Sequence, residues 1–153
     1  MDGAGSHVPL LAAVVAIARP GPVLEVGVGD SSTPLLREMC KAMGRKLVGV
    51  DTSEEWARRY GALHVKDWAA FDEVFLSETW SVVFVDSSPW LHRLGVVTKV
   101  RAVLTEHIVI HDTDNQSGDL DDLLMLLGAF KHQHTDKTCT PWTTVVSETR
   151  SYP

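Results

Sequence analysis

The sequence has few cysteines and no long apolar run. Its two cysteines, Cys40 and Cys139, lie far apart with no metal-ligand spacing. This excludes a disulfide framework and favours two reduced thiols in a cytoplasmic protein. The longest apolar stretch, around Val8 to Ala18, is too short to span a bilayer and lacks the basic start of a signal peptide. We therefore expect a cytoplasmic protein with no membrane anchor.

Positive charge is also scarce. Fourteen Lys and Arg residues face 20 Asp and Glu residues, for a formal net charge of -6. A large non-specific nucleic-acid footprint needs a basic face, so we do not expect one, although a nucleotide is still permitted as a ligand. Repeats, low-complexity segments and inter-domain linkers are absent. The 153 residues are enough for one domain with a core, and we predict a single domain over residues 1–153.

The chain is organised around a short strand, a glycine turn and a helix start. Val23–Val26 has the apolar character of a buried strand and contains one acid, Glu25. Gly27 and Gly29 then bring little side-chain bulk, and Thr33-Pro34 predicts a capping hydroxyl followed by the first helical residue. Such a turn forms a seat for a nucleotide-like ligand at the carboxyl end of a parallel strand. Glu25 is placed to accept hydrogen bonds from that ligand.

Apolar periodicity predicts alternating strands and helices along the rest of the chain. Thr52 and Glu55 have the spacing of a capping box, which predicts a helix directly after Asp51. The remaining helices are predicted near residues 10–18, 34–43, 91–104 and 120–127. The strands are predicted at 23–26, 46–50, 62–65, 80–85, 107–110, 130–137 and 143–147, with the last two antiparallel.

Acidic residues follow the predicted second and third strands. Asp51 lies where an acid can accept both hydroxyls of a ribose. The alternative is that it only favours the positive end of the next helix. Asp67 and Trp68 follow the third strand, where they would bind an adenine amino group and stack on its ring. A capping aspartate and a packed tryptophan are the alternative.

The loops after the fourth and fifth strands border the same crevice and carry the candidate catalytic residues. His111 is the best candidate base, because imidazole titrates near neutral pH; the alternative is a histidine hydrogen-bonded to a neighbouring strand. Trp90 either walls the substrate or fills the core. Arg93 either holds an anionic substrate or lies on a solvated helix face. The full set is Asp86, Trp90, His92, Arg93, His111 and Asp112.

One further candidate precedes the first helix. His7 lies where a residue can fold over a bound ligand and contact the substrate. The alternative is a solvated residue. The chain has almost no insertion for a substrate-recognition cap, so specificity must come from short loops, from this N-terminal segment or from a partner subunit. A homodimer is possible, although no particular residue indicates it.

Three segments resemble the class I S-adenosylmethionine (SAM)-dependent methyltransferases. They are Val23–Gly29, Val48–Asp51 and Val83–Asp86. The resemblance implies an α/β, Rossmann-like three-layer sandwich. Its seven-stranded sheet would have the order 3-2-1-4-5-7-6 and one antiparallel strand. Further segments at 21–27, 31–36, 110–113 and 141–147 look like a group of small stand-alone methyltransferase-like proteins of bacteriophages and bacteria.

The resemblance also implies a SAM site. Glu25, Gly27 and Gly29 would face the methionine part, and Asp51 with Thr52 would hold the ribose. Asp67 and Trp68 would face the adenine, while Asp86 would contact the substrate or the cofactor amine. Ser31 stands where the family often has a third glycine, and its hydroxyl can still donate a hydrogen bond. A nicotinamide dinucleotide is disfavoured because Ser32 replaces the last glycine of that fingerprint.

A metal is the less favoured interpretation. Catechol-type methyltransferases place an acid after the fourth strand, as Asp86 does, and an Asp-Asn pair after the fifth. Asp112 or Asp114-Asn115 would supply the second set, and oxygen ligands suit Mg²⁺. The pair lies two residues late and the usual lysine is absent, so we predict no metal. His132 and His134 share a strand face, where they could bind a metal, but we favour a sheet surface.

These observations predict a SAM-dependent methyltransferase that acts on an oxygen or nitrogen of an unidentified acceptor. Two alternatives stay open. One is a SAM-binding module without catalysis, because no unmistakable catalytic motif is present. The other is a different enzyme on the same scaffold.

Overall fold

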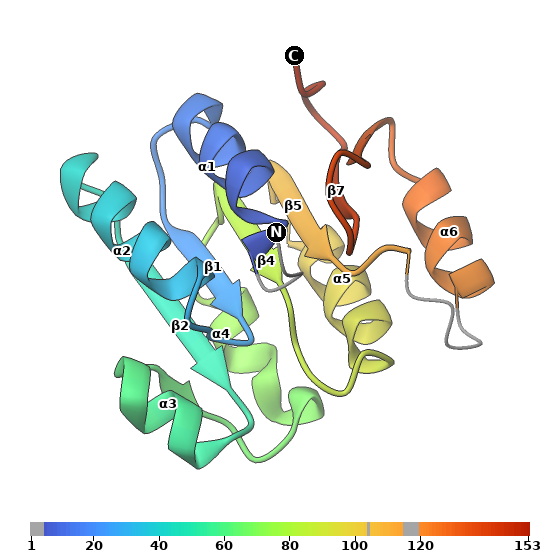
Figure 1. Ribbon diagram of the computed structural model, residues 1–153. Coiled ribbons are helices and arrows are strands. Elements are labelled where there is room, and N and C mark those ends of the chain that lie inside the picture. The colour runs from blue at the N-terminus through green and yellow to red at the C-terminus, as the bar shows by residue number, and fades with distance from the viewer. Residues whose placement is uncertain (1–4, 104, 115–119) are drawn as a thin grey trace.

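The computed structural model describes residues 5–103, 105–114 and 120–153. Seven strands form one sheet in the order β3-β2-β1-β4-β5-β7-β6 (Figure 1). β7 is antiparallel to both of its neighbours, and the other pairs are parallel. This confirms the predicted strand order and the single antiparallel strand. The strands are β1 Val23–Val26, β2 Leu47–Asp51, β3 Leu63–His64, β4 Val82–Val85, β5 His107–His111, β6 His132–Asp136 and β7 Thr143–Ser147.

Helices cover both faces of the sheet (Figure 1). One face carries α1 and α2, whose apolar side chains pack on β1, β4, β5 and β7. The other face carries α4, α5 and α6. The helices are α1 Val8–Ile17, α2 Ser32–Ala42, α3 Glu54–Tyr60, α4 Asp72–Leu76, α5 His92–Ala102 and α6 Leu120–Gly128, with a 3-10 turn at Trp68–Phe71. None of these described helices is long and apolar enough to cross a membrane.

The central strands explain this two-sided core. Every residue of β1, β4 and β5 is buried, as expected for parallel strands covered on both faces. Successive side chains point to opposite faces, so Leu24 and Val26 join the cluster under α5, whereas Val23 joins the one under α1. Glu25 also points toward the α1–α2 face, which places a carboxyl group inside an apolar layer.

The register aligns the ends of four strands. Val26 pairs with Val50 and with Val85, and Val85 pairs with Ile110. The next residue of each strand therefore lies at the same carboxyl edge of the sheet. Those residues are Gly27, Asp51, Asp86 and His111.

Two predicted helix starts were wrong by one or two residues. α2 begins at Ser32 with Ser31 as its N-cap, so Thr33 lies inside the helix. α3 is capped by Ser53, whose hydroxyl accepts the Trp56 N–H at 3.4 Å, in place of the capping box at Thr52. Hydroxyl residues occur in short runs at both places, and local sequence cannot decide which one takes the cap. The short α4 was not predicted.

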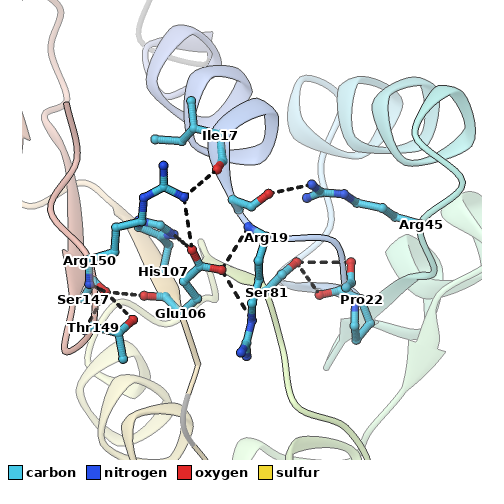
Figure 2. Close-up of polar contacts among 12 residues, drawn as sticks. Ile17, Arg19, Pro22, Arg45, Ser81, Glu106, His107, Ser147, Thr149 and Arg150 are labelled. Carbon is cyan, nitrogen blue, oxygen red and sulfur yellow. Dashed lines mark hydrogen bonds and ion pairs between the residues drawn. The ribbon is translucent and has the colours of Figure 1, made fainter.

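A buried carboxylate ties α1 to the amino edge of the sheet (Figure 2). Glu106, just before β5, accepts the Arg19 backbone N–H at 3.0 Å and pairs with the Arg19 guanidinium at 3.4 Å. Arg150 lies 3.8 Å from the same carboxylate and donates to the Ile17 carbonyl. Arg45 donates to two more carbonyls near the end of α1. These contacts fix α1 at one end, and its other end reaches the carboxyl edge.

Candidate functional site

The glycine turn after β1 lies directly against the end of β4. Gly27 has φ +89°, and a Cβ atom there would lie 2.5 Å from the Asp86 carbonyl oxygen. Asp86 in turn donates its backbone N–H to the Val26 carbonyl at 2.8 Å. Only glycine fits both this conformation and this spacing. The turn and the Asp86 loop are therefore held as one surface.

Gly27→Ala is expected to lower the free energy of unfolding by about 2–5 kcal/mol, because it combines a strained φ with a backbone overlap. Gly29→Ala is the matched control. Its nearest contact would be the Ser32 hydroxyl at 3.7 Å, and we expect a change below about 1 kcal/mol. Urea denaturation of both variants tests this. Equal losses would contradict the packing argument.

Asp51 is held by backbone groups on two sides. Its Oδ2 accepts the Val28 N–H at 3.0 Å and its Oδ1 accepts the Ser53 N–H at 2.7 Å. A carboxylate has about four acceptor positions, so roughly two stay available to a ligand. The carbonyl of Thr52 lies 3.2 Å from His64 Nε2. The arrangement orients the Asp51 carboxylate at the end of β2, where the ribose was predicted.

Glu25 supports the same turn from inside the protein. Its Oε1 accepts hydrogen bonds from the hydroxyls of Ser32 at 2.5 Å and Thr33 at 3.0 Å. Thr33 Oγ1 also accepts the Gly29 N–H at 2.9 Å. Glu25 Oε2 is buried without a partner and lines a cavity of about 70 Å³, which is too small for a methionine side chain. The bonds that Glu25 makes thus go to α2, and its contact with the cofactor stays a prediction.

Burial raises the pKa of Glu25 to about 7, and this effect outweighs the hydrogen bonds from Ser32 and Thr33, which lower the pKa. The unfolded chain loses this proton near pH 4.5, whereas the folded protein keeps it. The stability that Glu25 contributes is therefore fully present below pH 4.5 and is lost as the pH rises to about 7.

Glu25→Gln is expected to remove this pH dependence, which amounts to about 3 kcal/mol. Urea denaturation across this pH range should show a falling stability in the wild type and a flatter profile in the variant. Glu38→Gln, on the exposed side of α2, is the control and should keep the wild-type profile. A Glu25→Gln profile parallel to the wild type would contradict the assignment.

Asp67 and Trp68 line an open cavity of about 360 Å³ together with the first turns of α5. This volume is within the range of small-molecule sites. The segment begins beside Asp51, because the Val65 N–H donates to the Asp51 carbonyl at 3.0 Å. Trp68 is largely buried, and its indole N–H donates to the Ser88 carbonyl at 3.1 Å. Trp68 therefore belongs to the core and also to the cavity wall.

A buried charged cluster lies at the ends of β4 and β5, around Arg93. Its guanidinium pairs with Asp86 Oδ1 at 2.8 Å and with Asp112 Oδ2 at 2.9 Å. It also donates to the carbonyls of Ser87 and His111. Arg93 is only 5% exposed, so the solvated helix face is wrong. An anionic substrate would have to displace one of these partners, and that role stays a prediction.

Trp90 connects the two loops from the side. Its indole N–H donates to the Asp112 carbonyl at 3.1 Å, and its ring is partly buried against the core. Asp112 has φ +57°, a conformation that non-glycine residues adopt at some energetic cost. The contacts with Trp90 and Arg93 hold Asp112 in that conformation.

The N-terminal segment closes the cluster from the α1 side. His7 is 2% exposed, so the solvated alternative is wrong. Its ring lies 4.5 Å from the His111 ring and 4.9 Å from the Phe84 ring, centroid to centroid. Burial, and next the nearby His111, lower the pKa of His7 to about 4. Ser31 faces this segment, 4.0 Å from where a Cβ of Gly5 would lie, and its hydroxyl makes no capping bond.

Both nitrogens of His111 are engaged by side chains. Ser6 Oγ donates its single proton to the Pro141 carbonyl at 2.8 Å, so His111 Nε2, 2.9 Å from that oxygen, must donate to it. His111 Nδ1 lies 3.2 Å from Asp86 Oδ1 and 3.5 Å from Asp112 Oδ1. A proton taken from a substrate would require one of these contacts to open. The role of His111 as a base stays a prediction.

The oxygen ligands of the catechol-type metal site have other partners. Asp112 is paired with Arg93, and Asp114 Oδ1 accepts the Trp142 N–H at 2.9 Å. Asn115 lies outside the described residues. The His134 ring packs against Tyr152 at 4.8 Å, in line with a sheet surface.

Comparisons with known proteins bear on the fold. No protein-family model matches the chain, and no curated protein matches it. Among solved structures, a SAM-dependent methyltransferase from Archaeoglobus fulgidus shares the fold with a TM-score of 0.56. The two chains are 13% identical, and the match covers 91% of this chain and 93% of that one. The chain thus has the Rossmann-like fold of a SAM-dependent methyltransferase over nearly its whole length.

Ser6, Ser32 and Ser87 are among the site residues that were not predicted from the sequence. Ser32 bonds Glu25, and Ser87 gives its carbonyl to Arg93. Ser6 bonds His111 across 105 positions of chain. A buried acid beside a run of hydroxyl residues could have indicated Ser32, but no local signal indicates Ser6.

Proposed function

We propose that the protein binds SAM at the carboxyl edge of β1 and β2 and transfers its methyl group to an oxygen or nitrogen acceptor. The observation that carries this proposal is the Asp51 carboxylate, which two backbone N–H groups orient while about two acceptor positions stay available. A ribose diol needs two acceptors of this kind. The fold shared with a SAM-dependent methyltransferase supports the same choice of cofactor.

The rest of the cofactor has room around this anchor. The cavity of about 360 Å³ that Asp67 and Trp68 line is where we propose that the adenine binds. The methionine part would follow the glycine turn toward Asp86, at the end of β4. The acceptor would then enter between the ends of β4 and β5, beside His7, His111 and Trp90. Methyl transfer requires in-line approach and exclusion of water, more than a strong base.

A SAM-binding module without catalysis is the second candidate. It is favoured by the closed hydrogen bonding of the cluster, where Asp86, Arg93, His111 and Asp112 all pair with protein groups. In that case the pocket would serve as a sensor of the cofactor.

Isothermal titration calorimetry with SAM, S-adenosylhomocysteine and NAD tests the cofactor, in buffer containing a chelator. We expect both sulfur nucleotides to bind and NAD not to bind. Absence of binding by either sulfur nucleotide would overturn the proposal. If they bind, transfer of a labelled methyl group to a panel of metabolites and macromolecules separates the enzyme from the module.

A further inference from the structure

We infer that His7, Asp86 and His111 form a binding site for a divalent transition-metal ion. One ligand atom from each residue lies within 4.8 Å of the others. Within the part of the chain that the structure describes, no other group of three such residues meets this condition. The site shares Asp86 with the catechol-type oxygen set, but its other two ligands are histidines.

His7 makes no hydrogen bond with its imidazole ring. Both of its ring nitrogens are buried and lack a hydrogen-bond partner. Leaving buried polar atoms unpaired costs about 1–3 kcal/mol, and native structures rarely do so without a reason. The His7 backbone is held by the Leu11 N–H, which its carbonyl accepts at 2.9 Å, and the His7 ring packs against Phe84. A nitrogen of His7 therefore lies within 4.8 Å of a carboxylate oxygen and of a second imidazole nitrogen.

His111 and Asp86 already lie close to each other. The Ser6 hydroxyl donates its hydrogen bond to the Pro141 carbonyl, so His111 Nε2–H donates to the Ser6 oxygen. With Nε2–H donated to Ser6, the lone pair of His111 Nδ1 lies 3.2 Å from Asp86 Oδ1, and a metal ion between the two atoms would bind both.

The ligand geometry fits a metal ion. Bonds of 2.0–2.1 Å in a tetrahedral zinc site put neighbouring ligand atoms about 3.3 Å apart, close to the 3.2 Å between His111 Nδ1 and Asp86 Oδ1. The His7 ligand nitrogen lies within 4.8 Å of these two atoms. It would have to move toward them by roughly 1.5 Å or less to reach the same spacing. The bond from His111 Nε2 to Ser6, and that from Arg93 to Asp86, are the outer contacts that commonly orient metal ligands.

The donor set selects the class of ion. Two imidazole nitrogens and one carboxylate oxygen suit Zn²⁺, Fe²⁺ or Co²⁺, whereas Mg²⁺ and Ca²⁺ prefer oxygen alone. The formal charge also permits a cation, because Asp86 and Asp112 outnumber Arg93. Three protein ligands leave at least one coordination position for another molecule. If the proposed methyl transfer is correct, that position would hold the acceptor oxygen.

Titration of chelator-stripped protein with Zn²⁺ and with Co²⁺, without SAM, tests the site. We expect one bound ion in the wild type and a loss of affinity of roughly 100-fold or more in His7→Gln and His111→Gln. The double variant His132→Gln/His134→Gln removes the other neighbouring pair of histidines and should bind like the wild type. Metal binding and SAM binding are measured separately, so failure of one proposal does not decide the other.

Three results would overturn the inference. They are absence of binding to the wild type, binding unchanged in folded His7→Gln, or binding lost only in the His132/His134 variant. Should His7→Gln fail to fold, the visible absorption spectrum of Co²⁺ bound to the wild type provides a second measurement. Co²⁺ in a four-coordinate site absorbs visible light strongly, whereas a spectrum like that of hydrated Co²⁺ would contradict the site.

Discussion

Asp51→Ala is expected to weaken SAM binding by roughly 100-fold or more. The carboxylate would contribute two charge-assisted hydrogen bonds to the ribose, each of about 1.5–3 kcal/mol, and alanine removes both. It also frees the Val28 and Ser53 N–H groups, which hold the glycine turn to the end of β2. Calorimetric titration of the purified variant with SAM measures the effect.

Two further variants separate these contributions. Asp51→Asn keeps one acceptor oxygen and a similar shape, so its affinity should fall between the alanine variant and the wild type. Glu78→Ala removes an acid at the amino edge, where Glu78 pairs with Lys46 at 2.6 Å, and it should leave the affinity unchanged. If folded Asp51→Ala binds SAM as the wild type does, Asp51 does not hold the ribose.

Arg93→Met should lower the free energy of unfolding by about 3–5 kcal/mol, the largest stability effect that we expect from removing one charge. The guanidinium is buried between the carboxylates of Asp86 and Asp112 and binds two carbonyls besides. Methionine has a similar length but leaves both carboxylates without their cation. Urea denaturation at neutral pH gives the size of the loss.

Lys46→Met is the matched control for Arg93. Its partner Glu78 is at the surface, and the side chains of this pair are 59% and 32% exposed, against 6% for that of Arg93. We expect a loss below about 1 kcal/mol in this control. A comparable small loss in Arg93→Met would mean that solvent reaches the cluster and replaces the guanidinium. The loss of stability in Arg93→Lys should be smaller than that in Arg93→Met but larger than that in Lys46→Met. One ammonium group cannot bind both carboxylates with the geometry of a guanidinium.

The sheet was the most predictable part of the molecule. β1 and β7 were predicted residue for residue. An apolar run between proline and glycine marks β1, and β-branched residues after Pro141 mark β7. The strand order came from the resemblance of three motifs and not from periodicity, which does not specify which strands pair. Asp51, Asp86 and His111 then fall at one edge, since parallel strands in register end together.

Side-chain partners at the site were much less predictable. Arg93 lies in the first turn of a helix, and the sequence contains no sign that two loops close over it. His7 and Ser6 reach their partners across most of the chain, so no local pattern reports the contact. For Glu25 the sequence identified the right turn, but the bond went to Ser32 and Thr33 because the side chain alternates toward the α2 face. Such choices depend on packing that only the folded chain defines.

The contacts of Glu106 at the amino edge have a consequence at the opposite edge. α1 has ten residues and is about 15 Å long, and a helix of this length behaves as a stiff rod. Glu106, Arg45 and Arg150 fix one end of the rod, while His7 lies at the other end against His111. The depth to which His7 enters the site is thus set one helix length away, by residues that flank β2, β5 and β7 and make no contact with the site.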